Sequence, residues 1–300
     1  MANAKELTLK LGLHLSNFTY GIPTTDFAAK LDDIVAAADE GGFDRLSVMD
    51  HYFQIPNVGP AENEMFEAYG LLGYLAARTS RVKLGVLTTG ITYRHPGFLA
   101  KQVTGLDVLS GGRAWAGVGA AWFEREHLGL GIPFPPLAER FERLEETIQV
   151  LMQMWSDNDG PYEGKHYQLA ETLCSPVPIQ QPHPPQLVAG SGERKTLRLV
   201  ARYANFCNIA GDNPENVERR LGILAAHCEA ERRDYDAIEK TIVTRFDPGP
   251  NGERADELVD RLARFAEVGV QAALGSAVNV EDPRTIEQLA TKVIPQLRDL

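Results

Sequence analysis

Residues 81–120 read RVKLGVLTTGITYRHPGFLAKQVTGLDVLSGGRAWAGVGA and alternate between two kinds of periodicity. The aliphatic run at 81–90 predicts a strand, and the run at 112–120 predicts another. Between them, residues 95–110 are typical of a helix with a proline near its start. Two strands joined through a helix are normally parallel neighbours in one sheet. This stretch therefore predicts a strand–helix–strand unit.

The same alternation extends in both directions over nearly all of the 300 residues. Further strands are predicted at 7–15, 43–50, 185–190, 205–211, 240–247 and 270–277. Helices are predicted at 25–42, 64–80, 139–155, 191–204, 214–233, 254–269 and 282–300. Eight strand–helix units are what a (β/α)8 TIM barrel needs, so we expect one barrel domain over 1–300. An irregular insertion at about 156–185, with a hairpin-like PYEGKHYQL segment at 161–169, interrupts it.

A doubly wound open sheet is the alternative fold. It is disfavoured because there are eight units and because no G-x-G-x-x-G pattern follows the first strand. The chain is 44% hydrophobic and 24% charged, which is typical of a globular protein with a sizeable core. No apolar run approaches the roughly 20 residues that span a bilayer.

Composition also limits the partners. The net charge of −11 argues against nucleic acid, which attracts basic surfaces. The segment MANAKELTLK lacks the features of a signal peptide, so we expect a cytoplasmic protein. The three cysteines, Cys174, Cys207 and Cys228, form neither a disulfide framework nor a zinc pattern, and no other motif predicts a metal.

Candidate functional residues follow the predicted strands, because barrel enzymes carry their active sites at the carboxyl ends of the strands. Asp50 and His51 follow the strand at 43–50, in the stretch SVMDHYFQIPN. His51 is a candidate proton carrier, and Asp50 could orient it or contact a ligand. The alternative is that the pair only caps the loop. His14, at the end of the first strand, is equally compatible with a functional and a structural role.

Three further strand ends are unusual. Hydroxyls and glycine in GVLTTGITYRHP (85–96) indicate either close approach of the backbone to a ligand or a bulge at the rim. Amides of Gly190, Ser191 and Gly192 at a helix start predict a phosphate site, the alternative being a tight turn with a capping serine. Trp122 is a candidate wall for an aromatic ligand. Glu124 and Glu126 are expected in a solvated helix start, and His127 is expected to be structural or exposed.

Taken together, LGLHLSNF, EGGFDRLSVMDHYFQ, the block 81–146 and PPQLVAGSGERKTLRLVARYANFCN resemble the bacterial-luciferase-like (LLM class) superfamily of barrel oxidoreductases. The resemblance is strongest to the branch that uses the deazaflavin coenzyme F420. It implies that His51 transfers a proton and that a non-proline cis bond joins Leu87 to Thr88 beneath the deazaflavin ring. The cofactor-binding residues that it implies are Asp50, Leu87, Thr88, Thr89, Gly119, Ala120, Gly190, Ser191, Gly192 and Glu193. His14 and Trp122 would face the substrate.

Two departures leave the substrate open. Family members that oxidise sugar phosphates carry a glutamate where this chain has Trp122, and the loop after His51 lacks their tryptophan. The resemblance thus implies an F420-dependent oxidoreductase that transfers a hydride to or from a small organic molecule. An FMN-dependent two-component monooxygenase and a non-catalytic flavin-binding protein are the alternatives. A reductase that supplies reduced cofactor and a homodimer are the expected partners, and loops 51–63 and 121–138 are the expected substrate entrance.

Overall fold

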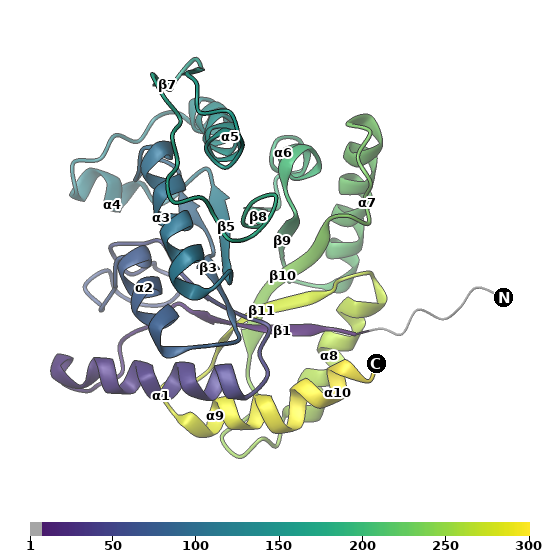
Figure 1. Ribbon diagram of the computed structural model, residues 1–300. Coiled ribbons are helices and arrows are strands. Elements are labelled where there is room, and N and C mark those ends of the chain that lie inside the picture. Colours follow the sequence, from purple (N-terminus) through teal and green to yellow (C-terminus); the bar gives the residue numbers. More distant parts are fainter. Residues whose placement is uncertain (1–7) are drawn as a thin grey trace.

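Eight parallel strand positions form a closed barrel with helices around it (Figure 1). The computed structural model describes residues 8–300, so Leu7 of the predicted first strand and the predicted lack of a signal peptide lie outside the described residues. The ring closes because β3 and β5 pair directly, with Leu84 opposite Ala114. The predicted (β/α)8 TIM barrel is confirmed. Its strands are β1 (Lys10–Leu15), β2 (Arg45–Val48), β3 (Lys83–Val86), β4 (Thr89–Gly90), β5 (Ala114–Gly119), β8 (Gln186–Ala189), β9 (Phe206–Ala210), β10 (Glu239–Phe246) and β11 (Ala272–Ala277).

The helices occupy the connections between the strands and form the outer layer in Figure 1. They are η1 (Thr24–Asp26), α1 (Phe27–Glu40), α2 (Ala68–Arg78), α3 (Pro96–Ser110), α4 (Glu124–Gly129), α5 (Leu137–Met154), α6 (Thr196–Tyr203), α7 (Pro214–Ala230), α8 (Ala255–Glu267), α9 (Pro283–Gln288), η2 (Leu289–Val293) and α10 (Ile294–Arg298). The last three run on as one helical segment, which packs against α1, α8 and β1.

Three predicted boundaries were wrong for local reasons. The helix predicted at 64–80 begins only at Ala68, because the side chain of Glu67 caps it by accepting from the Gly70 amide at 2.6 Å. The helix predicted from 191 begins at Thr196, after an irregular loop. The strand predicted at 81–90 is divided into β3 and β4 by a cis peptide bond between Leu87 and Thr88, which confirms the bond that the resemblance implied.

The predicted insertion carries a small antiparallel hairpin, β6 (Tyr162–Glu163) and β7 (Gln168–Leu169), where PYEGKHYQL indicated one. Its turn is tied to α5 because the Glu146 carboxylate accepts from three successive backbone amides. These belong to Lys165, His166 and Tyr167, at 2.9, 2.9 and 3.0 Å.

Side chains fill the barrel interior at its amino-terminal end. Arg45 is buried at the bottom and pairs with Asp44 at 2.7 Å and with Glu239 at 2.8 Å. Above it the indole of Trp115 lies against Leu187, Phe206 and Leu274. Gly85 makes this possible, because a Cβ there would lie 2.3 Å from the indole. The open end of the barrel is therefore the place for a ligand.

Candidate functional site

A cavity of about 430 Å³ opens at the carboxyl ends of the strands. Its lining comes from both the barrel strands and α5, so it spans the barrel mouth. Ten of the predicted site residues line it: His14, Asp50, His51, Leu87, Thr88, Gly119, Ala120, Trp122, Gly190 and Ser191. Residues predicted at five separate strand ends thus line one continuous cavity.

Three predicted cofactor-binding residues do not line this cavity. Thr89 is fully buried, and its hydroxyl lies 2.8 Å from the hydroxyl of Tyr69. The Glu193 carboxylate accepts from Arg219 of α7 at 2.7 Å, which directs it to the outer layer. The carbonyl of Gly192 accepts from the amide of Leu197 at 3.1 Å, so this residue serves the start of α6.

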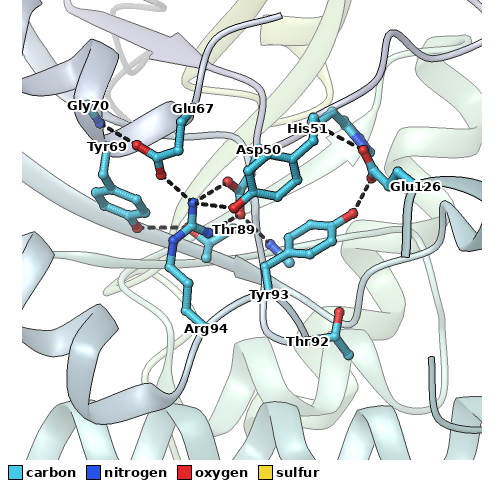
Figure 2. A network of polar contacts seen from close by, with 12 residues as sticks. Asp50, His51, Glu67, Tyr69, Gly70, Thr89, Thr92, Tyr93, Arg94 and Glu126 are labelled. Atoms are coloured by element: carbon cyan, nitrogen blue, oxygen red, sulfur yellow. Dashed lines mark hydrogen bonds and ion pairs between the residues drawn. The ribbon is translucent and has the colours of Figure 1, made fainter. Parts of the chain in front are cut away.

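His51 is held by a buried carboxylate that comes from the loop after β5. Its Nδ1 lies 2.6 Å from Oε1 of Glu126 (Figure 2). The other carboxylate oxygen accepts from the amides of Tyr52 at 2.8 Å and Phe53 at 3.2 Å. The hydroxyl of Tyr93 also donates to Oε1. The prediction that Glu126 lies in a solvated helix start was therefore wrong, because its side chain is completely buried, whereas Glu124 is exposed as expected.

The four hydrogen-bond donors around Glu126 determine which ring nitrogen of His51 carries a proton. Burial raises the pKa of Glu126, but the hydrogen bonds from His51 and Tyr93 outweigh it and hold the pKa below its ordinary value. An ionised carboxylate only accepts hydrogen bonds, so Nδ1 of His51 must carry a proton. In the neutral imidazole Nε2 is then the nitrogen that can accept a proton.

The helix that carries Glu126, α4, buries polar side chains and exposes an apolar one. Phe123, Glu126 and His127 of α4 and its N-cap face inward, while Leu128 and the adjoining Trp122 are exposed. Nδ1 of His127 donates to the carbonyl of Phe123 at 2.8 Å, and Nε2 lies 2.7 Å from the hydroxyl of Thr92. These contacts confirm the structural role expected for His127.

Asp50 is bound by protein groups on both of its oxygens. Arg94 makes a two-point contact with it, at 2.6 and 2.8 Å, and the Gly90 amide donates to it at 3.0 Å. Figure 2 shows the guanidinium of Arg94 between Asp50 and Glu67, which it also contacts at 2.6 Å. Burial lowers the pKa of Arg94, but the hydrogen bonds that it donates to Asp50, together with the charge of that carboxylate, raise the pKa by more. The carboxylate thus fixes Gly90, close to the cis bond between Leu87 and Thr88.

The floor of the cavity is backbone. The Leu87–Thr88 segment lies beside the end of β5, where a Cβ at Gly119 would come within 2.7 Å of the Thr88 hydroxyl. Any larger residue at 119 would have to displace Thr88. Two neighbouring strand ends therefore present a surface without large side chains, as close approach to a flat ligand requires.

The loop after β8 closes the opposite side. Gly190 has a φ of +129°, a conformation that residues with a side chain rarely adopt. The hydroxyl of Ser191 accepts from the Ala210 amide at 3.2 Å, which ties this loop to the end of β9. Because α6 begins only at Thr196, the predicted position of residues 190–192 at its first turn was wrong. Thr196 itself lines the cavity.

His14 lies deep in the same cavity. Its Nδ1 is 2.9 Å from the Ser47 hydroxyl on the neighbouring strand. Burial lowers its pKa to about 4, and the nearby positive charge of protonated His51 lowers it as well. His14 is therefore a neutral polar group at neutral pH.

This geometry can be compared with that of known proteins. The family described as luciferase-like monooxygenase matches residues 12–292. The chain belongs to this family. A curated relative from Nakamurella multipartita (strain ATCC 700099) is named F420-dependent glucose-6-phosphate dehydrogenase; it is 30% identical over 277 residues, which cover 88% of this chain and 76% of the relative.

Solved structures of other proteins share the fold of this family member. Coenzyme F420-dependent tetrahydromethanopterin reductase from Methanopyrus kandleri superposes with a TM-score of 0.78 at 20% identity, over 98% of this chain and 100% of that one. A riboflavin lyase with modified FMN and riboflavin gives a TM-score of 0.81 at 15% identity, over 97% and 91% of the two chains. At such identities the likeness concerns the barrel alone.

Sequence reasoning missed four residues of the polar network in this luciferase-like chain: Glu67, Tyr93, Arg94 and Glu126. An arginine directly after one strand can pair with an aspartate at the neighbouring strand end, and this signal could have joined Arg94 to Asp50. For Glu126 the signal was its spacing from Phe123, three positions earlier, which places the two residues on the same inward face of the helix.

Metal-binding clusters and membrane-spanning helices are both absent from the part of the chain that the structure describes. In residues 8–300, no three or more His, Cys, Asp and Glu side chains are grouped so as to hold a metal ion. Over the same residues, every helix is too short or too polar to cross a bilayer.

Proposed function

We propose that this chain is an F420-dependent oxidoreductase that transfers a hydride between the deazaflavin and a small organic substrate. His51 gives or takes the accompanying proton. The observation that carries the proposal is the contact between His51 and the buried carboxylate of Glu126, on the edge of a cavity with a backbone floor. The name of the relative that is 30% identical supports F420 as the cofactor.

The residues of the cavity fit such a cofactor. A flat ring needs a surface that it can approach closely, and the strand ends at Leu87, Thr88, Gly119 and Ala120 would provide it, with Gly119 leaving no room for a side chain. In the loop after β8, Ser191 would hold the phosphate through its backbone amide and its hydroxyl, because the Gly190 amide already donates to the Asn208 carbonyl at 3.1 Å. When bound, F420 would supply the hydride chemistry, and the protein would supply orientation and electrostatics.

His51 performs the acid–base work in this proposal. Its neutral ring accepts a proton at Nε2 when a substrate is oxidised and returns it when a substrate is reduced. Glu126 stabilises the imidazolium, because a carboxylate beside a buried cation compensates its charge. The rings of Trp122 and Phe123 lie 5.6 and 5.9 Å from that of His51 and restrict access of water. Such general acid–base catalysis typically contributes about 10²–10⁴-fold.

An FMN-dependent monooxygenase is the second candidate, because the family itself is described as luciferase-like monooxygenase. It would need a flavin reductase as a partner. In the F420 case another F420-linked enzyme would regenerate the cofactor, and a homodimer is compatible with either activity. Reduced FMN would use the same cavity, so only binding separates the two candidates.

Parallel fluorescence titrations of the cofactor-free protein with F420 and with FMN test the proposal. We expect F420 to bind much more tightly than FMN. Tighter binding of FMN would favour the monooxygenase. If neither cofactor binds, both candidate functions are wrong.

A further inference from the structure

We infer that the substrate of this chain is an uncharged, largely apolar molecule, bound against Trp122 and Leu137 at the mouth of the cavity. The inference rests on the proposed function for the reaction and on the lining of the cavity for the substrate. It excludes sugar phosphates, on which the named relative acts.

The first observation is the apolar rim. Trp122 and Leu137 both line the cavity, and each is 56% exposed. Leu128 and Leu130, in the same segment between β5 and α5, are also exposed. Exposed apolar groups that gather at the entrance of a cavity mark a binding surface, because covering them is favourable. Phe141 and Leu144 of α5 continue this apolar side into the cavity.

The second observation concerns charge. Among the described residues, no lysine or arginine lines the cavity, and Asp50 is its only charged carboxylate. Arg94 already neutralises that carboxylate with two hydrogen bonds. A phosphate or carboxylate of a substrate would lose its hydration at the rim without gaining a cation, which is unfavourable.

Two cations, Arg140 and Lys195, lie near the rim but do not line the cavity. Arg140 donates to the carbonyls of Pro135 at 3.0 Å, Ala120 at 3.2 Å and Ala121, and its guanidinium lies 4.1 Å from the ring centre of Phe134. Lys195 lies over the ring of Phe141 at 5.2 Å, just before α6 and next to the loop proposed for the cofactor phosphate. Arg140 is therefore not available to an anion bound beside Trp122, whereas Lys195 is exposed and lies on the side of the loop proposed for the cofactor phosphate.

An uncharged ketone is a simple substrate with these properties. In the direction of reduction, an uncharged ketone receives a hydride on its carbonyl carbon from the reduced cofactor, and its oxygen takes the proton from Nε2 of His51. The carbon–oxygen π bond breaks, one C–H and one O–H bond form, and the cofactor is oxidised. The product is the uncharged alcohol, and the reverse reaction oxidises that alcohol.

Matched probes test the inference. Cyclohexanone and 4-oxocyclohexanecarboxylate differ by one charged group, and glucose 6-phosphate represents the sugar phosphates. Binding to the cofactor-free protein is followed by tryptophan fluorescence, since Trp122 is exposed while Trp115 and Trp155 are buried. Turnover is followed separately by cofactor absorbance. We expect the uncharged ketone to bind at least about tenfold more tightly than the carboxylate, or about 1.4 kcal/mol, and glucose 6-phosphate to show no saturable binding.

A pair of variants connects this preference to the rim. Leu137→Arg places a cation at the entrance, and Leu109→Arg makes the same change at an exposed position on α3 away from the cavity. We expect only Leu137→Arg to reduce the preference for the uncharged ketone. Equal or tighter binding of the carboxylate or glucose 6-phosphate by the unchanged protein, or no binding of the ketone, overturns the inference. Failure of F420 to bind overturns the proposed function instead, because the probe binding does not depend on the cofactor.

Discussion

The Nδ1 atom of His51 lies 2.6 Å from Oε1 of Glu126, although the two residues are 75 positions apart in the chain. One follows β2 and the other follows β5, so this contact joins two loops on the working face of the barrel. The same carboxylate accepts hydrogen bonds from the Tyr93 hydroxyl and from two backbone amides. A single buried charge therefore determines both the shape of the loop after β2 and the tautomer of the histidine.

Glu126→Gln should lower kcat/KM by about 10–100-fold, the usual effect of removing a group that orients a functional histidine. The substitution keeps the size of the side chain but removes the charge that requires a proton on Nδ1. Nitrogen-15 NMR of His51 should show the Nδ1–H tautomer in the unchanged protein and a mixture in the variant. Glu124→Gln, an exposed change on the same helix, is the control and should alter neither quantity. Identical tautomers and rates in Glu126→Gln would contradict the role given to this carboxylate.

Arg94→Met should destabilise the fold by about 3–5 kcal/mol, because it leaves the buried Asp50 carboxylate without its cation. The measurement is denaturant unfolding. Arg78→Met is a matched control, since Arg78 pairs with Asp32 at 3.2 Å on the surface, where such pairs contribute about 0–1 kcal/mol. Equal losses of unfolding free energy in the two variants would show that the contact between Arg94 and Asp50 stabilises the fold no more than a surface ion pair does.

The pKa of His14 predicts a pH dependence of stability. Burial and the charge of His51 lower this pKa from 6.5 to about 4 in the folded protein. Between these values the unfolded chain binds a proton that the folded protein does not, so stability falls as the pH falls through this window. The slope due to His14 approaches about 1.4 kcal/mol per pH unit. His14→Gln should remove it, as seen in unfolding curves at about pH 7, 6 and 5. If the unfolding free energy of the unchanged protein and of His14→Gln depended on pH in the same way, this would be inconsistent with a neutral buried His14.

Gly190→Val should weaken F420 binding by at least about tenfold, because a branched side chain strains the loop at a φ of +129° and obstructs its amides. Gly111→Val provides the control for strain, since Gly111 also has a positive φ, of +71°, but ends α3 with nothing within 4 Å of a Cβ. We expect both variants to lose stability and only Gly190→Val to lose affinity. Unchanged affinity in Gly190→Val would argue against a phosphate site in this loop.

The sequence was sufficient for the barrel because its strands and helices differ in period over almost every unit. It also located His51, Thr88 and Gly119 at one cavity, because all parallel strands end on the same face. These predictions depend on the order of strands and helices along the chain. The periodicity does not record loop conformation, which is why the start of α6 was placed too early, before Thr196.

The partners of the predicted residues were harder to find. Glu126 lies in the short helix α4 and Arg94 in the loop after β4, and their burial depends on contacts with residues far away in the sequence. A glutamate in a polar stretch such as FEREH is usually solvated, since a charge is buried only when enough donors surround it. Those donors, Tyr93 and the amides after His51, converge only in the folded barrel.

The most direct test of the account is the effect of His51→Ala on two quantities, the dissociation constant of F420 and the rate of turnover. We predict that the dissociation constant stays nearly unchanged, because the backbone floor and the Gly190 loop remain, while kcat falls by about 10²–10⁴-fold. An unchanged kcat would contradict the proposal that His51 carries the proton.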